Sequence, residues 1–216
     1  MRRVALLAIV AEVVATALAW SRLPDRIAMH WNIHGEPNGY GSKLELVLFG
    51  PVLLAFIWGL VEVLPRLDPK LAKSDPQQTE EERYGAMRVV TGVVMLMLAA
   101  IHVTILLHAL GILHDTARVF AVIFGGFLVA FGNFAGRLRP SFFIGIRTPW
   151  TLSSDHVWRR THRLASRLMV PAGLVLLVVA VAAPLGWMVP ALVAMAGVAF
   201  VPPLVMSYVW WRQRPV

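Results

Sequence analysis

The chain has 216 residues, of which 58% are hydrophobic and only 15% are charged, and its formal net charge is +8. This apolar fraction exceeds the roughly 45–50% of soluble domains, so the composition argues against a soluble globular protein and favours an integral membrane protein. The sequence contains no cysteine, which excludes disulfides, a thiolate nucleophile and cysteine-bound metal.

Six apolar runs approach or exceed the length of about 20 residues that a helix needs to cross the hydrocarbon core of a bilayer. They are Val4–Trp20, Leu44–Leu64, Val89–Leu110, Ala117–Ala135, Leu168–Ala183 and Val189–Trp211. We therefore predict an all-α integral membrane protein with six transmembrane helices. The first run is expected to be retained and not cleaved as a signal peptide, because the following residues, SRLP, offer no small-residue cleavage site.

The distribution of positive charge predicts how these helices are oriented, because cytoplasmic segments of membrane proteins are enriched in lysine and arginine. With both termini in the cytoplasm, the outer segments contain only four of the 20 basic residues, Arg22, Arg26, Lys43 and Arg118. We therefore predict cytoplasmic N- and C-termini and a basic inner face that meets anionic membrane lipid. Direct binding of nucleic acid is not expected, because much of the positive charge adjoins the membrane.

The predicted outer loop MHWNIHGEPNGYGSK, residues 29–43, concentrates polar side chains between two apolar runs. Residues 27–34 alternate in a period of two, which predicts a short half-buried strand, and a turn follows. One side of the strand would carry Ile27, Met29, Trp31 and Ile33, and the other Ala28, His30, Asn32 and His34. We interpret this loop as a lid or a ligand-recognition surface.

The residues expected to bind an outer ligand are His30, Trp31, Asn32, His34 and Glu36. A metal site at His30 and His34 is the alternative interpretation. In a strand these two residues lie roughly 13 Å apart, which is too far to share one ion. No metal and no cofactor is therefore predicted.

The predicted inner loop SFFIGIRTPWTLSSD, residues 141–155, is the second dense motif. Gly145 and Pro149 indicate a tightly shaped backbone. Arg147 lies between them, where a fixed guanidinium is suited to pair with a carboxylate or a phosphate.

An amphipathic helix is predicted to follow this loop and to lead into the fifth span. Ser153 or Ser154 is the expected N-cap, and Arg159, Arg163 and Arg167 form a basic stripe at helical spacing. Such a helix is typical of a segment that lies at the membrane surface.

These two loops resemble the SdpI family of bacterial multi-pass membrane proteins. The N-terminal part resembles an uncharacterised membrane domain often found ahead of the SdpI region, through Pro24, His30-Trp31-Asn32, Gly35-Glu36-Pro37 and Lys43. The C-terminal part resembles the SdpI region itself, through Gly145-Ile146-Arg147-Thr148-Pro149-Trp150-Thr151-Leu152, Trp158 and Thr161-His162-Arg163. Two positions depart from the pattern, since Ser141 replaces a common asparagine and Asn38 a common aspartate.

The resemblance implies a non-enzymatic immunity protein of the bacterial cell membrane. Its expected partners are membrane lipid, a secreted peptide toxin such as SdpC outside the cell, and a transcriptional repressor sequestered on the cytoplasmic side. We expect a domain at 1–66, a cytoplasmic linker at 67–88 and an SdpI-like region at 89–216. The residues expected to form the inner partner-binding loop are Gly145, Arg147, Thr148, Pro149, Trp150, Trp158 and His162.

Ionisable residues inside the predicted spans suggest a second class of function, because such residues often line transport paths. Glu12 and His102 would pair in a small transporter or flippase, or would simply form an interhelical hydrogen bond that holds the bundle. A membrane enzyme would have to use His30, His34 and Glu36, or Arg147 with His156 and His162. We do not expect an enzyme, because no known catalytic spacing supports it.

Overall fold

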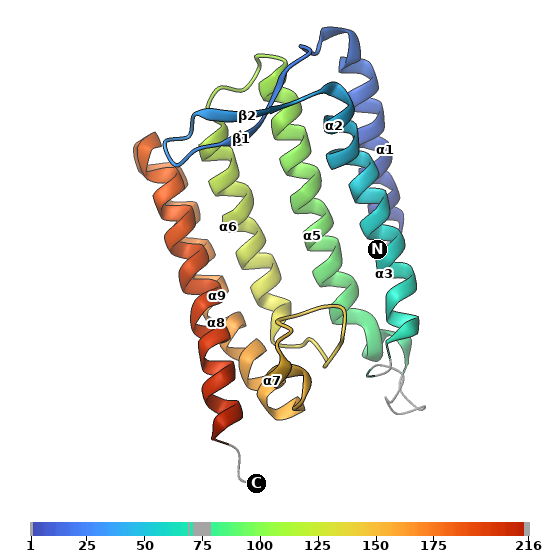
Figure 1. Cartoon of the computed structure of the whole chain (residues 1–216), viewed down its shortest axis with the longest axis vertical. Helices are drawn as coiled ribbons and strands as arrows, with labels where there is room; N and C mark the ends of the chain where they lie inside the picture. Colours follow the sequence, from blue (N-terminus) through green and yellow to red (C-terminus); the bar gives the residue numbers. More distant parts are fainter. Residues whose placement is uncertain (1, 69, 71–78, 214–216) are drawn as a thin grey trace.

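A computed structural model describes residues 2–68, 70 and 79–213, and it shows one bundle of long helices with a short β-ribbon at one end (Figure 1). The elements are α1 (Arg2–Ala19), η1 (Trp20–Arg22), β1 (Ile27–Trp31), β2 (Pro37–Gly41), α2 (Lys43–Val47), η2 (Leu48–Val52), α3 (Leu53–Leu67), α5 (Glu80–Ala109), α6 (Thr116–Ala135), α7 (Pro149–Leu152), α8 (Asp155–Ala182), η3 (Leu185–Trp187) and α9 (Met188–Arg212). We call the end that carries β1 and β2 the ribbon end, and the end that carries residues 136–154 the loop end.

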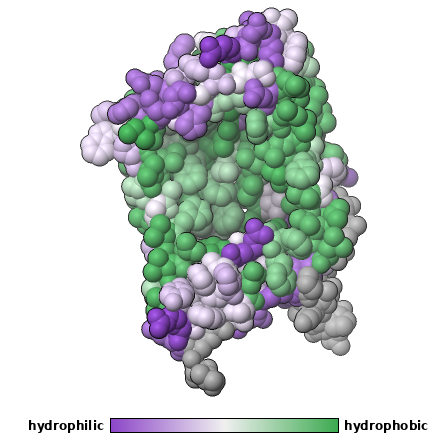
Figure 2. Space-filling model, viewed as in Figure 1, coloured by the Kyte–Doolittle hydropathy of each residue, from purple (hydrophilic) through white to green (hydrophobic). Residues whose placement is uncertain are grey.

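Six helical segments of the described chain are long and apolar enough to cross a membrane, which confirms the predicted fold class. The surfaces of these helices that face away from the bundle expose large aliphatic side chains, such as Leu18 and Val181. Figure 2 shows this apolar surface as a belt between two hydrophilic ends. An exposed apolar belt of this kind is stable only in lipid, where helices satisfy their own backbone hydrogen bonds.

The second span is broken near its start. α2 begins with a capping box in which the Ser42 hydroxyl accepts from the Glu45 backbone N–H, and the Glu45 carboxylate accepts from the Ser42 N–H. The π-helical turn η2 then contains Gly50 in a non-helical conformation, followed by Pro51. Proline cannot continue the backbone hydrogen-bond ladder, so the helix kinks here.

The predicted amphipathic helix and the fifth span form one continuous helix, α8, and are not two elements. Ser154 is the N-cap, and its hydroxyl accepts from the backbone N–H of Val157. The basic stripe is confirmed, because Arg159, Arg163 and Arg167 are all exposed. The long helix persists because its other face packs against α6, where Gly125 and Gly173 let the two backbones approach closely.

The third helix begins at Glu80, ahead of the predicted start of the span at Val89, so the last part of the predicted linker is helical. Its N-cap is Thr79, which forms a capping box with Glu82. α5 therefore extends beyond the apolar run at the loop end.

The strand predicted from the alternation at residues 27–34 is confirmed as β1, which pairs antiparallel with β2. Ile27 is buried, Met29 and Trp31 are half-buried and His30 is exposed, as the alternation predicts. The alternation fails at two positions, because Ala28 is buried and Ile33 is exposed. The register shifts after Ala28 and again after His30, and β1 ends at Trp31, so the period of two does not persist.

Candidate functional site

The turn between β1 and β2 is organised by Asn32. Its side-chain oxygen accepts from the backbone N–H groups of His34 (2.9 Å) and Glu36 (3.0 Å). Its side-chain nitrogen donates to the Glu36 carboxylate at 3.1 Å. Gly35, with a φ of 78°, completes the turn in a conformation that favours glycine. Asn32 and Glu36 therefore hold the shape of the turn, while His34 remains exposed.

His30 and Trp31 are neighbours in β1 but make different contacts. The His30 ring nitrogen Nδ1 and the Asn38 side-chain oxygen are 2.6 Å apart, so the asparagine takes part in ribbon structure. Trp31 packs edge-on against His108 and Phe120, with ring centroids 5.5 and 5.2 Å away. Trp31 thus anchors the ribbon to α5 and α6.

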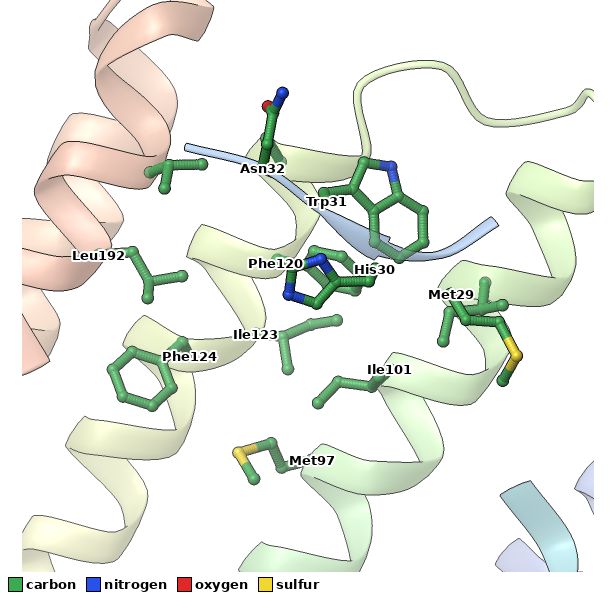
Figure 3. A pocket seen from close by; sticks show the side chains of 13 residues that line it. Met29, His30, Trp31, Asn32, Met97, Ile101, Phe120, Ile123, Phe124 and Leu192 are labelled. Carbon is green, nitrogen blue, oxygen red and sulfur yellow. The ribbon is translucent and has the colours of Figure 1, made fainter. Parts of the chain in front are cut away.

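A cavity of about 370 Å³ lies beneath β1, between α5, α6 and α9 (Figure 3). Its walls are apolar side chains from the helices, among them Met97, Ile101, Ile123 and Leu192. His30, Trp31 and Asn32 of the ribbon also line it. In Figure 3 the His30 ring lies among the side chains that line the cavity, whereas the amide of Asn32 points away from them. Three of the five predicted outer residues therefore meet at one cavity, and His34 and Glu36 do not line it.

The metal alternative has no ligand set in the structure. Among the described residues, no group of three or more His, Asp or Glu side chains is arranged to hold an ion. The two histidines of the loop differ in their surroundings. His30 contacts Asn38 and lines the cavity, whereas His34 does not line it.

Glu12 and His102 lie buried inside the helix bundle, both under 4% exposed. His102 does not hydrogen-bond Glu12. The His102 Nε2 lies 3.0 Å from the hydroxyl of Thr16, which belongs to α1 like Glu12. Within the described part of the chain, neither carboxylate oxygen of Glu12 has a hydrogen-bond partner. The predicted hydrogen bond between Glu12 and His102 is therefore not formed, and His102 contacts α1 through Thr16 instead.

At the loop end, two of the predicted residues, Trp158 and His162, form the buried support of the inner loop. The Trp158 indole N–H donates to the Leu138 carbonyl, and the Trp158 ring stacks on His162 with centroids 4.2 Å apart. The His162 Nε2 accepts from the backbone N–H of Ile146 at 2.9 Å. Gly145 has a φ of 119°, and an added Cβ there would overlap both rings. Trp158 and His162 therefore fix the loop from below and present no surface to a partner.

The remaining inner-loop residues lie around the short helix α7. Thr148 is the N-cap of α7 and forms a capping box with Thr151. The Trp150 indole N–H donates to the Ser207 hydroxyl on α9. Pro149 and Arg147 are exposed, and the Arg147 Nη1 donates to the Phe142 carbonyl at 2.9 Å. A partner that docks on this loop can therefore reach Arg147 and Pro149 most directly.

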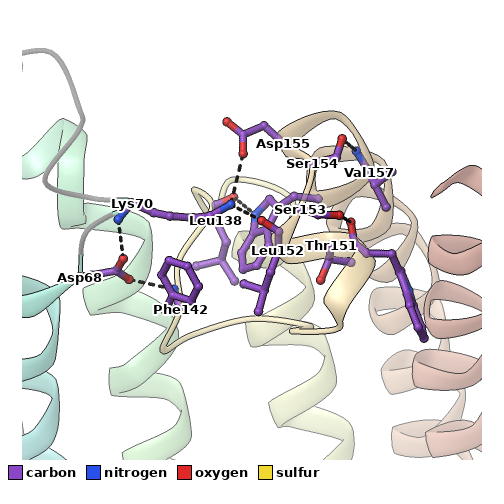
Figure 4. Close-up of polar contacts among 12 residues, drawn as sticks. Asp68, Lys70, Leu138, Phe142, Thr151, Leu152, Ser153, Ser154, Asp155 and Val157 are labelled. Atoms are coloured by element: carbon purple, nitrogen blue, oxygen red, sulfur yellow. Dashed lines mark hydrogen bonds and ion pairs between the residues drawn. The ribbon is translucent and has the colours of Figure 1, made fainter. Parts of the chain in front are cut away.

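Asp68 and Lys70, which follow α3, form hydrogen bonds with the inner loop, and we call this set of contacts the clasp (Figure 4). The sequence did not indicate these contacts. The buried Asp68 carboxylate accepts from the Ser141 hydroxyl at 2.7 Å and from the Phe142 backbone N–H at 2.9 Å. The Lys70 ammonium donates to the Leu152 carbonyl at 2.6 Å and lies 3.6 Å from the Asp155 carboxylate. The one signal in the sequence is an acidic residue four positions after the apolar run that ends at Leu64. The clasp joins the N-terminal and C-terminal parts of the chain.

Comparisons with known proteins find similarity in two separate ranges of the chain. Residues 137–207 match the SdpI/YfhL protein family, and residues 7–55 match a domain of unknown function, DUF1648. The immunity protein SdpI of Bacillus subtilis (strain 168) is 22% identical over 165 residues, which cover 76% of this chain and 74% of that protein. No solved structure matches. The chain is therefore a multi-pass protein of the bacterial cell membrane in which residues 7–55 are similar to DUF1648 and residues 137–207 are similar to the SdpI/YfhL family.

Proposed function

We propose that this protein confers immunity by binding a secreted toxic peptide at its ribbon end. The observation that carries the proposal is the cavity of about 370 Å³ beneath β1. Its size is within the roughly 300–1,000 Å³ of ligand pockets, and its apolar walls with polar groups at one side are typical of them. The similarity to the immunity protein SdpI supports the same function.

The proposed binding mode uses both sides of the ribbon. An apolar segment of the peptide enters the cavity and contacts the walls formed by α5, α6 and α9. His30 contacts the ligand at the cavity, while the exposed His34 and Glu36 meet the polar part of the peptide above the membrane. This mode requires the ribbon end to face outside, which is the orientation that the distribution of basic residues predicts.

A relay to the cytoplasm is the second part of the proposal. β1 packs against α5, and Trp31 packs against both α5 and α6, which run from the cavity to the loop end. A ligand that displaces the ribbon would shift these helices against the inner loop, where Arg147 and Pro149 are exposed. A cytoplasmic partner such as a transcriptional repressor would read that change.

The experiment is growth of a Bacillus subtilis strain that lacks SdpI, expresses this protein and is exposed to the secreted SdpC toxin. Ile123→Phe fills the cavity from α6 and should abolish survival. Val122→Phe, at the neighbouring lipid-exposed position, is the matched control and should preserve it. Membrane levels of each variant are measured by immunoblot. Equal survival of both variants at equal protein level would refute binding in this cavity.

A small transporter or flippase is the second candidate, and one observation favours it. The Glu12 carboxylate is buried within the span of α1 and has no partner among the described residues. Buried ionisable groups inside spans mark ion and proton paths in many transporters. Glu12→Gln separates the two candidates, since proton-coupled transport would be lost, whereas toxin binding at the ribbon end would remain.

A further inference from the structure

A second cavity, of about 320 Å³, lies at the loop end and is separate from the one beneath the ribbon. Its walls come from five helices and include Val61 of α3, Val94 of α5, Phe131 of α6, Met169 of α8 and Phe200 of α9. These side chains are apolar and belong to spanning helices, so the interior of the cavity resembles the hydrocarbon core of the membrane.

Three polar side chains also line this cavity, and two of them are already satisfied. The Thr91 hydroxyl donates to the Met87 carbonyl at 2.9 Å. The two ring nitrogens of His162 contact the Ile146 N–H and the Trp158 carbonyl. Arg147 is the third. Neither Thr91 nor His162 is therefore free to bind a ligand.

Arg147 combines an exposed guanidinium with a fixed backbone. Among the described residues its guanidinium makes one hydrogen bond, from Nη1 to the Phe142 carbonyl. Arginine has five N–H donors, so most of them remain available. The loop beneath it is held by Gly145 and His162, which places the charge at the edge of the cavity. In Figure 2, hydrophilic atoms interrupt the apolar belt just below a hollow on the same face.

We propose that this cavity binds an anionic phospholipid of the adjacent leaflet. The phosphate pairs with the guanidinium of Arg147, and one acyl chain occupies the apolar cavity. The fork of an arginine matches two oxygens of a phosphate. A volume near the lower limit of ligand pockets suits a single chain, and the headgroup remains at the membrane surface.

Charge complementarity selects this occupant over the alternatives. A soluble phosphate has no apolar part, so it would leave the apolar cavity unfilled. A zwitterionic lipid fills the cavity equally well but carries a cationic group that weakens its attraction to Arg147. An acidic partner protein could pair with Arg147 but has no need of a cavity inside the membrane. The proposed site does not depend on toxin immunity.

The test is native mass spectrometry of the full-length protein in mild detergent, titrated with palmitoyl-oleoyl phosphatidylglycerol, the matching phosphatidylcholine, or glycerol 3-phosphate. Wild-type protein should retain phosphatidylglycerol preferentially and should not retain glycerol 3-phosphate. Arg147→Gln should weaken phosphatidylglycerol binding about tenfold or more, since charge-assisted hydrogen bonds are the strong ones. Arg159→Gln, which removes an exposed charge on α8, is the matched control and should bind like wild type.

A second pair of variants tests the acyl-chain part of the site. Val94→Phe narrows the cavity and should reduce retention of phosphatidylglycerol. Leu96→Phe, at a lipid-exposed position of the same helix, should not. Thermal unfolding in the same detergent verifies folding, and Val61→Leu replaces Val94→Phe if the latter unfolds.

Three outcomes would overturn the proposal. Equal binding of both lipids would remove the role of charge. Unchanged binding in Arg147→Gln would leave Arg147 for a protein partner. Binding of glycerol 3-phosphate as tight as that of the lipid would show an anion site without a lipid chain.

Discussion

The Asp68 carboxylate accepts a hydrogen bond from the Ser141 hydroxyl at 2.7 Å. This contact joins two residues that are separated in the sequence by two membrane-spanning segments. Asp68 follows α3 directly, whereas Ser141 opens the inner loop. The carboxylate also accepts from the backbone N–H groups of Phe142 and Lys70. The N-terminal helices are thus tied to the loop that the SdpI/YfhL region contributes.

The first prediction concerns the stability that this contact contributes. Asp68→Ala removes a buried acceptor and leaves the Ser141 hydroxyl and the Phe142 N–H unpaired, which costs about 1–3 kcal/mol for each buried group that water cannot reach. The unfolding temperature in detergent should fall clearly. Asp155→Ala is the control, because its exposed ion pair with Lys70 contributes roughly 0–1 kcal/mol. Equal destabilisation by the two substitutions would show that the buried hydrogen bonds of Asp68 stabilise the protein no more than the exposed ion pair does.

The second prediction separates packing from recognition on the ribbon. Trp31→Ala removes the ring contacts with His108 and Phe120 and should destabilise the protein by roughly 2 kcal/mol or more. His30→Ala loses one exposed contact with Asn38 and should cost about 1 kcal/mol or less. Thermal unfolding in detergent measures both effects. A loss for His30→Ala as large as that for Trp31→Ala would contradict the division of the strand into two faces.

The third prediction is the orientation in the membrane. The chain contains no cysteine, so single cysteines can be labelled without background. His34→Cys at the ribbon end should react with a membrane-impermeant maleimide in intact cells. His156→Cys at the loop end should react only after lysis, because the basic residues around it are expected to face the cytoplasm. Both histidines are exposed, so access to the reagent decides the result. The reverse pattern would invert the orientation.

The features predicted correctly from the sequence are local ones. Runs of apolar residues predict spans because each helix meets lipid independently of its neighbours, and Ser154 caps α8 through residues within one turn of it. The strand is predicted by the alternation at Ile27, Met29 and Trp31, but the alternation says nothing of where pairing with β2 ends. Ile33 lies beyond that point and is exposed.

The features that the sequence did not indicate depend on residues far apart in the chain. The partners of Asp68 come from the inner loop, and the partner of His102 is Thr16 of α1. The inner-loop residues share a motif, yet Trp158 and His162 are buried supports while Arg147 is exposed. Spacing in the sequence places these residues near one another, but only the packing of α8 against α6 determines which of them are buried.

The last prediction tests the contact between the broken helix and the buried histidine. Gly50 lies against the His102 ring so closely that an added Cβ would overlap it, and the backbone at Gly50 is non-helical. Gly50→Ala should therefore destabilise the bundle, by about 1–3 kcal/mol for a substitution that overpacks a core. Gly126→Ala on α6 is the control, since an added Cβ there meets nothing, and it should leave stability unchanged or slightly raised.

A double-mutant cycle identifies His102 as the cause of that loss. His102→Ala removes the ring and its hydrogen bond with Thr16, so it should destabilise the protein by itself. In the double variant Gly50→Ala/His102→Ala the added methyl group enters the space that the ring has left. Gly50→Ala should therefore lower the unfolding free energy much less in the His102→Ala background than in wild type. The expected coupling free energy between the two sites is at least about 0.5 kcal/mol. Strictly additive losses would mean that the backbone conformation at Gly50, and not the approach of His102, makes glycine necessary there.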